Sequence, residues 1–225
     1  MALTYRGLAC LLSYPTPAVK ETVGAISQVL REENLLPAAN RKAVDALIAE
    51  IAADDLYDLQ ECYIDIFDRT RSLSLNLYEH VHGESRERGQ AMVALLELYR
   101  SRGLELDANE LPDFLPVFLE FLSILPQAEA ASFLGEAVHV LEAMAVRLKK
   151  RDSRYQAVFD SLVALAGVRA EAGVVAALLA EPEQDPDDLE ALDKTWEESA
   201  VTFGPGEALV EAMRVPPKPA IARGA

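Results

Sequence analysis

Apolar residues recur along this chain at intervals of three and four, the spacing that places them on one face of an α-helix. No useful length of sequence alternates apolar and polar residues as a half-buried strand would. The pattern predicts an all-α, single-domain helical bundle. The apolar faces are Leu8, Leu11 and Leu12; Val19, Val23, Ile26 and Leu30; Val44, Leu47, Ile48 and Ile51; Leu56, Leu59, Tyr63, Ile66 and Phe67; Met92, Leu95, Leu96 and Tyr99; Leu134, Val138, Leu141 and Leu148; Tyr155, Val158, Phe159, Leu162 and Leu165; and Val174, Val175, Leu178 and Leu179.

Turn and capping residues divide this pattern into separate helices. Pro17 suits the first position of a helix, and Pro37 marks another start. Asp54 and Asp55 are natural N-caps for the helix predicted from Leu56 to Phe67. Gly103 fits the left-handed position that ends a helix.

Three more polar residues are predicted helix caps. Asp113 is expected to cap a helix that is apolar almost all round, which would place Pro116 at its third position. Ser132 is expected to begin one long helix that runs to about Lys150. Ser153 begins a capping-box pattern for the helix after that.

Composition changes after residue 180. Residues 1–180 form the predicted helical domain. Residues 181–204 are acidic and contain prolines, so we interpret them as a linker with a docking segment around Trp196. Residues 205–225 are predicted to be a flexible C-terminal tail.

The charge of the chain narrows the classes of partner. Its 37 acidic and 21 basic residues give a formal net charge of −16. Such a surface repels nucleic acid and anionic membranes, and it attracts a basic partner over distance. No run of apolar residues is long enough to predict membrane insertion. Cys10 and Cys62 lie in apolar helical patterns, as expected of reduced cysteines in a cytoplasmic protein.

The rare ionisable residues gather in one connector that begins at Tyr78. Its candidate binding residues are Tyr78, Glu79, His80, His82, Glu84 and Arg86, followed later by Glu110 and Asp113. Metal ligation is one interpretation, because imidazole and carboxylate groups bind metals. However, the H-E-x-x-H spacing is absent, and so are the cysteines that a zinc deaminase needs beside H-x-E. A third histidine, His139, is interpreted as a satisfied residue inside a helix.

No enzyme signature appears elsewhere. The chain lacks a G-x-S-x-G elbow, a Walker motif and a G-x-G-x-x-G loop. A scaffold of this kind can hold an amphipathic peptide helix in a groove between its own helices. Tyr63 and Phe67 are core aromatics by default, with a binding role as the alternative. The residues alone also leave open a general helical adaptor, or a metal-dependent enzyme that uses His80 and His82.

Two phrases of the sequence carry a family resemblance. EHVHGESRERGQAMV begins at Glu79 and ELPDFLPVFLEFLS begins at Glu110. Both closely resemble the nitrate reductase molybdenum cofactor assembly chaperones of the NarJ type, within the wider TorD/DmsD-like redox enzyme maturation family. The flanking stretches YIDIFDRTRSLSLNLYEHVHG and SRYQAVFDSLVALA agree, so the likeness extends over roughly residues 3 to 200.

The resemblance implies a non-catalytic, all-helical cytoplasmic chaperone. Its partner would be the apo catalytic (alpha) subunit of respiratory nitrate reductase, including the N-terminal peptide of that subunit. Molybdenum cofactor biosynthesis proteins are further implied partners. The chaperone would support molybdenum cofactor insertion and assembly of the complex. It would hold no cofactor stably and would contact the client's molybdenum cofactor at most transiently.

The resemblance also suggests where the client binds. The wider family's E-x-x-D-His pattern falls on Glu110, Asp113 and Phe114, with phenylalanine where histidine is common. That substitution removes a titrating group but leaves an apolar wall. The expected client-binding set is Tyr63, Phe67, Tyr78, Glu79, His80, His82, Glu84, Arg86, Glu110, Asp113 and Phe114. In it, Glu79, Glu84, Glu110 and Asp113 are expected to meet positive charges of the peptide.

Overall fold

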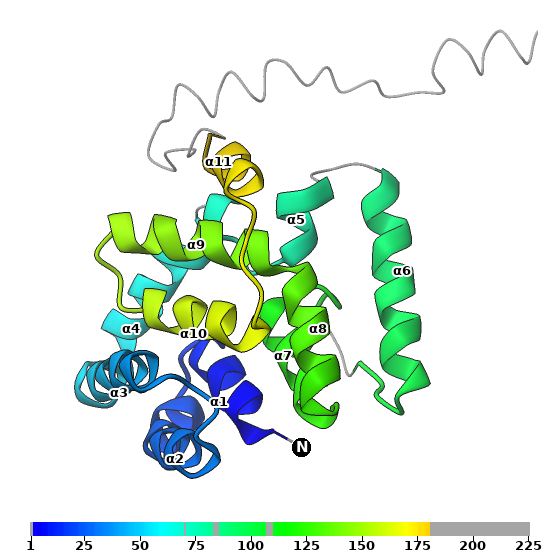
Figure 1. Ribbon diagram of the computed structural model, residues 1–225. Helices are drawn as coiled ribbons and strands as arrows, with labels where there is room; N and C mark the ends of the chain where they lie inside the picture. Colours follow the sequence, from blue (N-terminus) through cyan, green and yellow to red (C-terminus); the bar gives the residue numbers. More distant parts are fainter. Residues whose placement is uncertain (1, 70, 83–85, 107–109, 181–225) are drawn as a thin grey trace, which may run out of the picture. The chain divides into compact units, whose positions relative to one another are not determined.

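The computed structural model describes residues 2–69, 71–82, 86–106 and 110–180. In these ranges all the regular elements are helical, which confirms the all-α prediction (Figure 1). The predicted linker and tail, with Trp196, lie outside the described residues. The elements are α1 (Leu3–Leu11), α2 (Pro17–Glu33), α3 (Ala38–Ala53), α4 (Leu56–Tyr63), the π-helical turn η1 (Ile64–Asp68), the 3-10 turn η2 (Arg71–Leu73), α5 (Leu77–His82), α6 (Arg86–Ser101), α7 (Leu115–Ile124), α8 (Gln127–Glu136), α9 (Val138–Lys150), α10 (Gln156–Ala166) and α11 (Ala172–Ala180).

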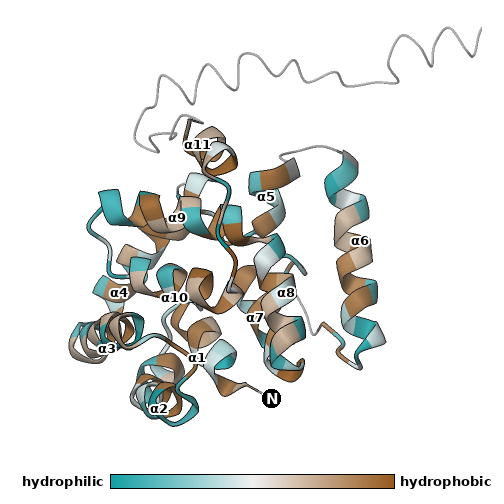
Figure 2. Cartoon of the chain, in the orientation of Figure 1, coloured by the Kyte–Doolittle hydropathy of each residue, from teal (hydrophilic) through white to brown (hydrophobic). Residues whose placement is uncertain are grey.

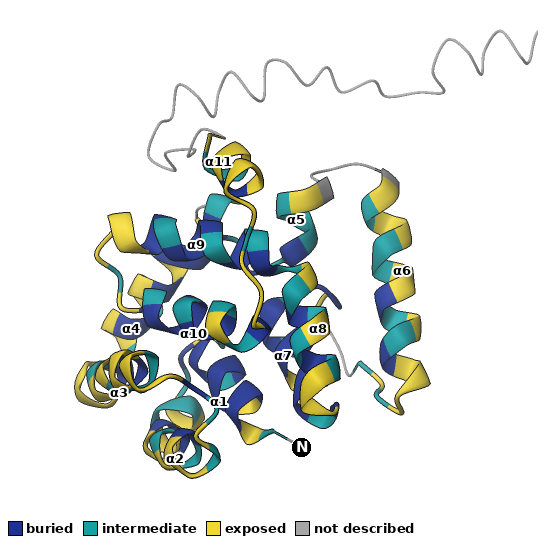
Figure 3. Cartoon of the chain, in the orientation of Figure 1, coloured by how far each residue is buried: buried dark blue, intermediate teal, exposed yellow. Residues whose placement is uncertain are grey.

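The helices pack in a series of neighbouring pairs that begins with α1 and α7. Helix α1 packs against both α7 and α2, α2 against α3, α3 against α10, and α10 against α8 and α9. Helix α7 is apolar almost all round, and Figures 2 and 3 show it brown and largely buried. Burial of apolar surface is the main favourable term in folding, and the buried leucines and phenylalanines of α7 belong to the hydrophobic core cluster. Leu8, Leu12, Leu119, Leu122, Leu141 and Leu162 are each 0% exposed.

Several predicted boundaries are confirmed by hydrogen bonds. The Thr16 hydroxyl accepts from the Val19 N–H at 3.2 Å, with Pro17 at the first helical position. The Asp55 carboxylate accepts from the Tyr57 N–H at 2.8 Å, so Asp55 is the N-cap of α4. These bonds satisfy backbone donors that a helix start leaves without partners.

Gly103 ends α6 as predicted. Its φ of +77° lies in the left-handed region that glycine adopts without a steric penalty. Its N–H donates to the Arg100 carbonyl at 3.0 Å, and the Leu104 N–H donates to the Tyr99 carbonyl at 3.1 Å. This pair of bonds is the Schellman motif.

The single long helix predicted from Ser132 was wrong. Helix α8 begins at Gln127, directly after Pro126, and Ser132 lies inside it. The backbone then departs from α-helical geometry at Ala137 (φ −91°, ψ −1°), and α9 begins at Val138. Pro126 explains the early start, because its fixed φ favours a helix that begins just after it.

The capping box predicted at Ser153 was also wrong. The Ser153 hydroxyl accepts from the Tyr155 N–H at 3.4 Å, but α10 begins only at Gln156. The Gln156 side chain donates forward to Asp160 at 2.9 Å rather than back to the Ser153 N–H. The reciprocal bond that defines the box is therefore missing.

No helix in the described ranges is both long enough and apolar enough to cross a bilayer.

Two glycines provide a matched test of the helix packing. A Cβ on Gly7 of α1 would lie 2.9 Å from Cγ2 of Ile26, a buried and β-branched residue of α2. A Cβ on Gly24 of α2 would meet nothing within 4 Å. We expect Gly7→Ala to lower the free energy of unfolding by about 1–2 kcal/mol through overpacking.

Gly24→Ala is the control, and it should raise the free energy of unfolding by up to about 1 kcal/mol because alanine favours helix. Urea denaturation of the two variants measures both effects. Equal effects of the same sign would contradict the close approach of α1 and α2.

Candidate functional site

Two stretches far apart in sequence cross at the centre of the candidate site. Asn76 and Phe114 form an antiparallel bridge. The Leu115 N–H donates to the Leu75 carbonyl at 2.8 Å, and the Leu77 N–H donates to the Asp113 carbonyl at 3.0 Å. The crossing therefore joins the polar connector to the segment that begins at Glu110.

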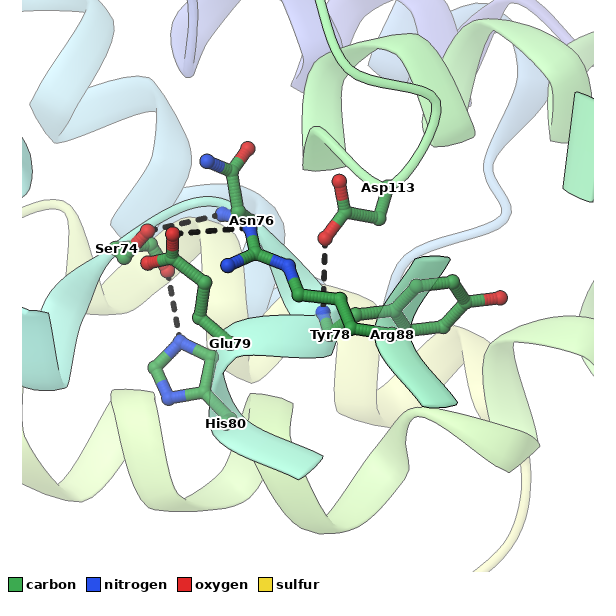
Figure 4. A network of polar contacts seen from close by, with 7 residues as sticks. All are labelled: Ser74, Asn76, Tyr78, Glu79, His80, Arg88 and Asp113. Atoms are coloured by element: carbon green, nitrogen blue, oxygen red, sulfur yellow. Dashed lines mark hydrogen bonds and ion pairs between the residues drawn. The ribbon is translucent and has the colours of Figure 1, made fainter. Parts of the chain in front are cut away.

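Asp113 caps a different helix from the one predicted. Its Oδ2 accepts from the Tyr78 N–H at 3.0 Å, at the start of α5 (Figure 4). The N-cap of α7 is Phe114, which gives no side-chain bond, and Pro116 is at the second helical position rather than the third. The crossing explains the error, because it places the start of α5 beside the Asp113 carboxylate.

Burial makes the Asp113 carboxylate unusual. The residue is 0% exposed, and its Oδ1 has no hydrogen-bond partner among the described residues. Burial raises its pKa above the ordinary value, although the bond from the Tyr78 N–H and the charge of Arg88 oppose the shift. Buried Asp113 therefore stabilises the backbone of the site, which we call the frame, through its bond to the Tyr78 N–H.

Glu79 and His80 also contact other residues of the chain and stabilise the frame. Glu79 forms an ion pair with Arg88 at 3.0 Å (Figure 4). Burial alone would raise the pKa of Glu79, but hydrogen bonds from Ser74 and Arg88 outweigh it and lower the pKa. The His80 Nε2 lies 2.8 Å from the Ser74 carbonyl. Both residues thus fasten α5 to neighbouring segments.

Three other candidate residues fall at the end of α5 or beyond it. His82 is the last residue of α5 and Arg86 is the first of α6. Glu84 lies outside the described residues, so the predicted connector is described only in part.

A groove of about 700 Å³ lies on one side of the crossing, and we call it the acidic groove. Four of the predicted client-binding residues line it, namely Tyr63, Phe67, Glu110 and Phe114. It is also lined by Ser13, Tyr14, Asp68, Ser74, Leu75, Asn76, Leu111, Pro116, Val117 and Glu120. The groove brings together the end of α1, the η1 turn, the crossing and the start of α7.

Aromatic rings form one wall of the acidic groove. The ring centroids of Tyr14 and Tyr63 are 5.5 Å apart with an edge-to-face geometry, and those of Tyr63 and Phe67 are 5.0 Å apart. The Tyr63 hydroxyl donates to the Leu12 carbonyl at 2.9 Å. Burial raises the pKa of Tyr63, which keeps the hydroxyl protonated as a donor. Packed rings and this bond fix the wall in place.

Three carboxylates border the same groove: Asp68, Glu110 and Glu120. None of them forms a carboxylate hydrogen bond or an ion pair with the described residues, and the groove lining contains no lysine, arginine or histidine. Burial raises the pKa of Asp68. Unpaired negative charges beside an aromatic wall favour a ligand that is partly apolar and positively charged.

Sequence reasoning missed Tyr14, Asp68 and Glu120. Asp68 ends the π-helical turn η1, where the Arg69 N–H donates to the Ile64 carbonyl at 3.0 Å. Periodicity does not reveal such a turn, which often occurs at a functional site. Glu120 did give a signal, because it is the only charged residue of the apolar helix α7.

A second groove, of about 340 Å³, lies between α5, α6 and the helices α7 to α9. Tyr78 and Asp113 line it together with mostly apolar residues such as Leu95, Phe118 and Phe133. Six of the predicted binding residues therefore line one or the other of two grooves, whereas Glu79 and His80 line neither.

The metal alternative gains no support from the geometry. Within the part of the chain that the structure describes, no three His, Cys, Asp or Glu side chains lie in a metal-binding group. His139 accepts from the Glu171 N–H at 3.1 Å through its Nδ1, as expected of a satisfied residue.

Comparison with known proteins decides the family. The family model described as "Nitrate reductase delta subunit" matches residues 33–161. The chain belongs to the nitrate reductase delta subunit family.

Relatives agree with this assignment. Over 206 residues the chain is 40% identical to "Nitrate reductase molybdenum cofactor assembly chaperone NarJ" of Escherichia coli (strain K12), covering 90% of this chain and 87% of the relative. It is 46% identical over 148 residues to the same strain's probable chaperone NarW, covering 66% and 64%. It is 28% identical over 165 residues to the probable NarJ of Bacillus subtilis (strain 168), covering 72% and 87%. These family members are named as assembly chaperones, in agreement with the prediction that the chain is not an enzyme.

Substitution of Asp113 tests its role in the frame. Asp113→Ala leaves the Tyr78 N–H without its acceptor and should lower the free energy of unfolding by about 1–3 kcal/mol. Asp113→Asn keeps an accepting oxygen and should be much less destabilising. Urea denaturation separates the two outcomes, and equal losses would show that the accepting oxygen does not matter.

The raised pKa of Asp113 predicts that the stability of the folded state depends on pH. Because the pKa of Asp113 is raised in the folded state, its contribution to stability is full below the ordinary value of 3.8 and is lost as pH rises through the raised pKa. Asparagine does not ionise, so Asp113→Asn should gain stability relative to the wild type as pH rises. Unfolding measured from about pH 3 upward should show a gain that begins near the ordinary value of 3.8 and levels off once the folded carboxylate has ionised. A difference between the two proteins that does not change with pH would contradict the raised pKa.

Proposed function

We propose that this chain is a cytoplasmic chaperone of respiratory nitrate reductase. It binds the apo catalytic subunit, including that subunit's N-terminal peptide, and supports insertion of the molybdenum cofactor and assembly of the complex. Family membership supports the client, since the relatives are named as nitrate reductase assembly chaperones. The acidic groove is the observation that carries the proposal for the peptide.

The chemistry of the acidic groove matches a basic amphipathic helix. The Tyr14–Tyr63–Phe67 wall and Val117 offer apolar surface, and burial of apolar area contributes roughly 25 cal/mol per Å². Apolar contacts therefore supply most of the affinity. The net charge of −16 attracts the peptide over distance, while the groove carboxylates orient it.

The carboxylates assigned to the peptide differ from the predicted set. Glu79 is paired with Arg88, and Asp113 is buried against α5. Asp68, Glu110 and Glu120 have no such partners among the described residues. We therefore assign the peptide's positive charges to Asp68, Glu110 and Glu120, and we assign a positioning role to Glu79, His80 and Asp113.

The chaperone holds no resident cofactor. The molybdenum cofactor belongs to the client, and any contact with it is transient. Cofactor biosynthesis proteins then act as further partners of the chaperone and client together.

Calorimetric titration with the N-terminal peptide of the same organism's catalytic subunit tests the proposal. Asp68→Asn/Glu120→Gln should raise the dissociation constant about three- to thirtyfold, since an exposed ion pair contributes up to about 1 kcal/mol. Raising the salt concentration should weaken binding to the wild type and should weaken it less for this variant.

Asp58→Asn/Glu61→Gln is the matched control. It removes the same two charges from exposed positions of α4 outside the acidic groove. It should change the dissociation constant less than twofold if local contacts rather than net charge decide binding. Equal effects of the two double variants would show that long-range attraction, rather than contacts in the acidic groove, explains the role of the charges. No binding by the wild type would favour a general helical adaptor for another partner.

A further inference from the structure

Arg147 is the one buried basic residue in the described ranges, with 2% of its surface exposed. A guanidinium keeps its charge at any physiological pH, so burying it is costly unless acceptors surround it. Two of its hydrogen bonds go to backbone carbonyls of different elements. Nη1 donates to the Ser72 carbonyl at 2.9 Å, and Nη2 donates to the Leu178 carbonyl at 2.6 Å.

The bond to Leu178 fastens the last turn of α11. The final carbonyls of a helix have no partner inside the helix, and a positive charge beside them interacts favourably with the helix dipole. Helix α11 also packs against α9. Val175 is its only buried residue, Leu178 is half-buried against the core, and its sequence AGVVAALLA carries no charge (Figure 2).

The bond to Ser72 fastens the wall of the acidic groove. Ser72 lies in η2. The residues that follow η2 directly, Ser74, Leu75 and Asn76, line the groove. These residues have their own connections, since Leu75 bonds to Leu115 across the crossing and the Asn76 N–H donates to the Ser74 hydroxyl at 3.2 Å. A shift of η2 would therefore move the groove wall.

We propose that Arg147 is a positioning residue that couples the docking of α11 to the shape of the acidic groove. Because one planar guanidinium bonds both carbonyls, release of α11 removes the bond to Leu178 and loosens the guanidinium, η2 and the groove wall. Release of α11 would thereby change the affinity of the groove for its peptide. The effect on affinity rests on the proposed function, whereas the coupling between α11 and η2 does not.

Arg147→Met tests the coupling, with Arg154→Met as the matched control. Arg154 is exposed and forms an ion pair with Glu50 of α3, so its loss removes the same charge from a residue that bonds α3. Arg147→Met should weaken peptide binding about tenfold. It should also speed hydrogen exchange of the Ser74, Asn76 and Leu77 amides and of residues 172–180, while α1 and α2 stay protected. Arg147→Lys keeps the charge but lacks the planar fork that reaches both carbonyls, so both effects should be smaller than in Arg147→Met.

Val175→Ser keeps the test valid if Arg147→Met fails to fold. It weakens the packing of α11 against the core and leaves Arg147 in place. The coupling predicts faster exchange at residues 74–77 in this variant as well. Faster exchange confined to residues 172–180, with unchanged peptide affinity, would overturn the inference. If the wild type does not bind the peptide, the proposed function fails, and the exchange pattern alone still decides the coupling.

Discussion

The candidate site depends on the backbone crossing of residues 75–77 with residues 113–115. Two backbone hydrogen bonds join the strand-like stretches, and the buried Asp113 carboxylate adds a third bond to the start of α5. A buried carboxylate with a single partner among the described residues is costly, so its position must be fixed by the packing around it. Without the crossing, the connector and the Glu110 segment would have no common geometry, and neither groove would exist in its present form.

Carboxylates of the same chemical type have two different roles around this crossing. Asp113 and Glu79 bond to groups of the chain itself and stabilise the frame. Asp68, Glu110 and Glu120 leave their negative charge available in the acidic groove. This division resembles a binding site whose rigid frame is satisfied internally while its ligand-facing groups remain free, which lowers the cost of ordering on binding.

Buried cationic and aromatic groups extend the frame beyond the crossing. The rings of Tyr63 and Phe67 continue to Tyr155, whose centroid lies 5.0 Å from that of Phe67. Arg147 links η2 to α11 on another side. The acidic groove is thus supported by helices from both ends of the described chain. Such contiguous packing allows an event at α11 to be transmitted to the groove.

The sequence by itself determined the helical fold, most helix boundaries and the family. Helical periodicity requires only local spacing, and caps such as Asp55 and Gly103 act on neighbouring backbone groups. The sequence also singled out Tyr63, Phe67, Glu110 and Phe114, which line one groove. Only the tertiary structure decided that Asp113 caps α5, that Glu79 is paired, and that Asp68 and Glu120 join the groove. Those roles depend on which distant segments meet, and the residues that meet across the crossing and through Arg147 share no local pattern.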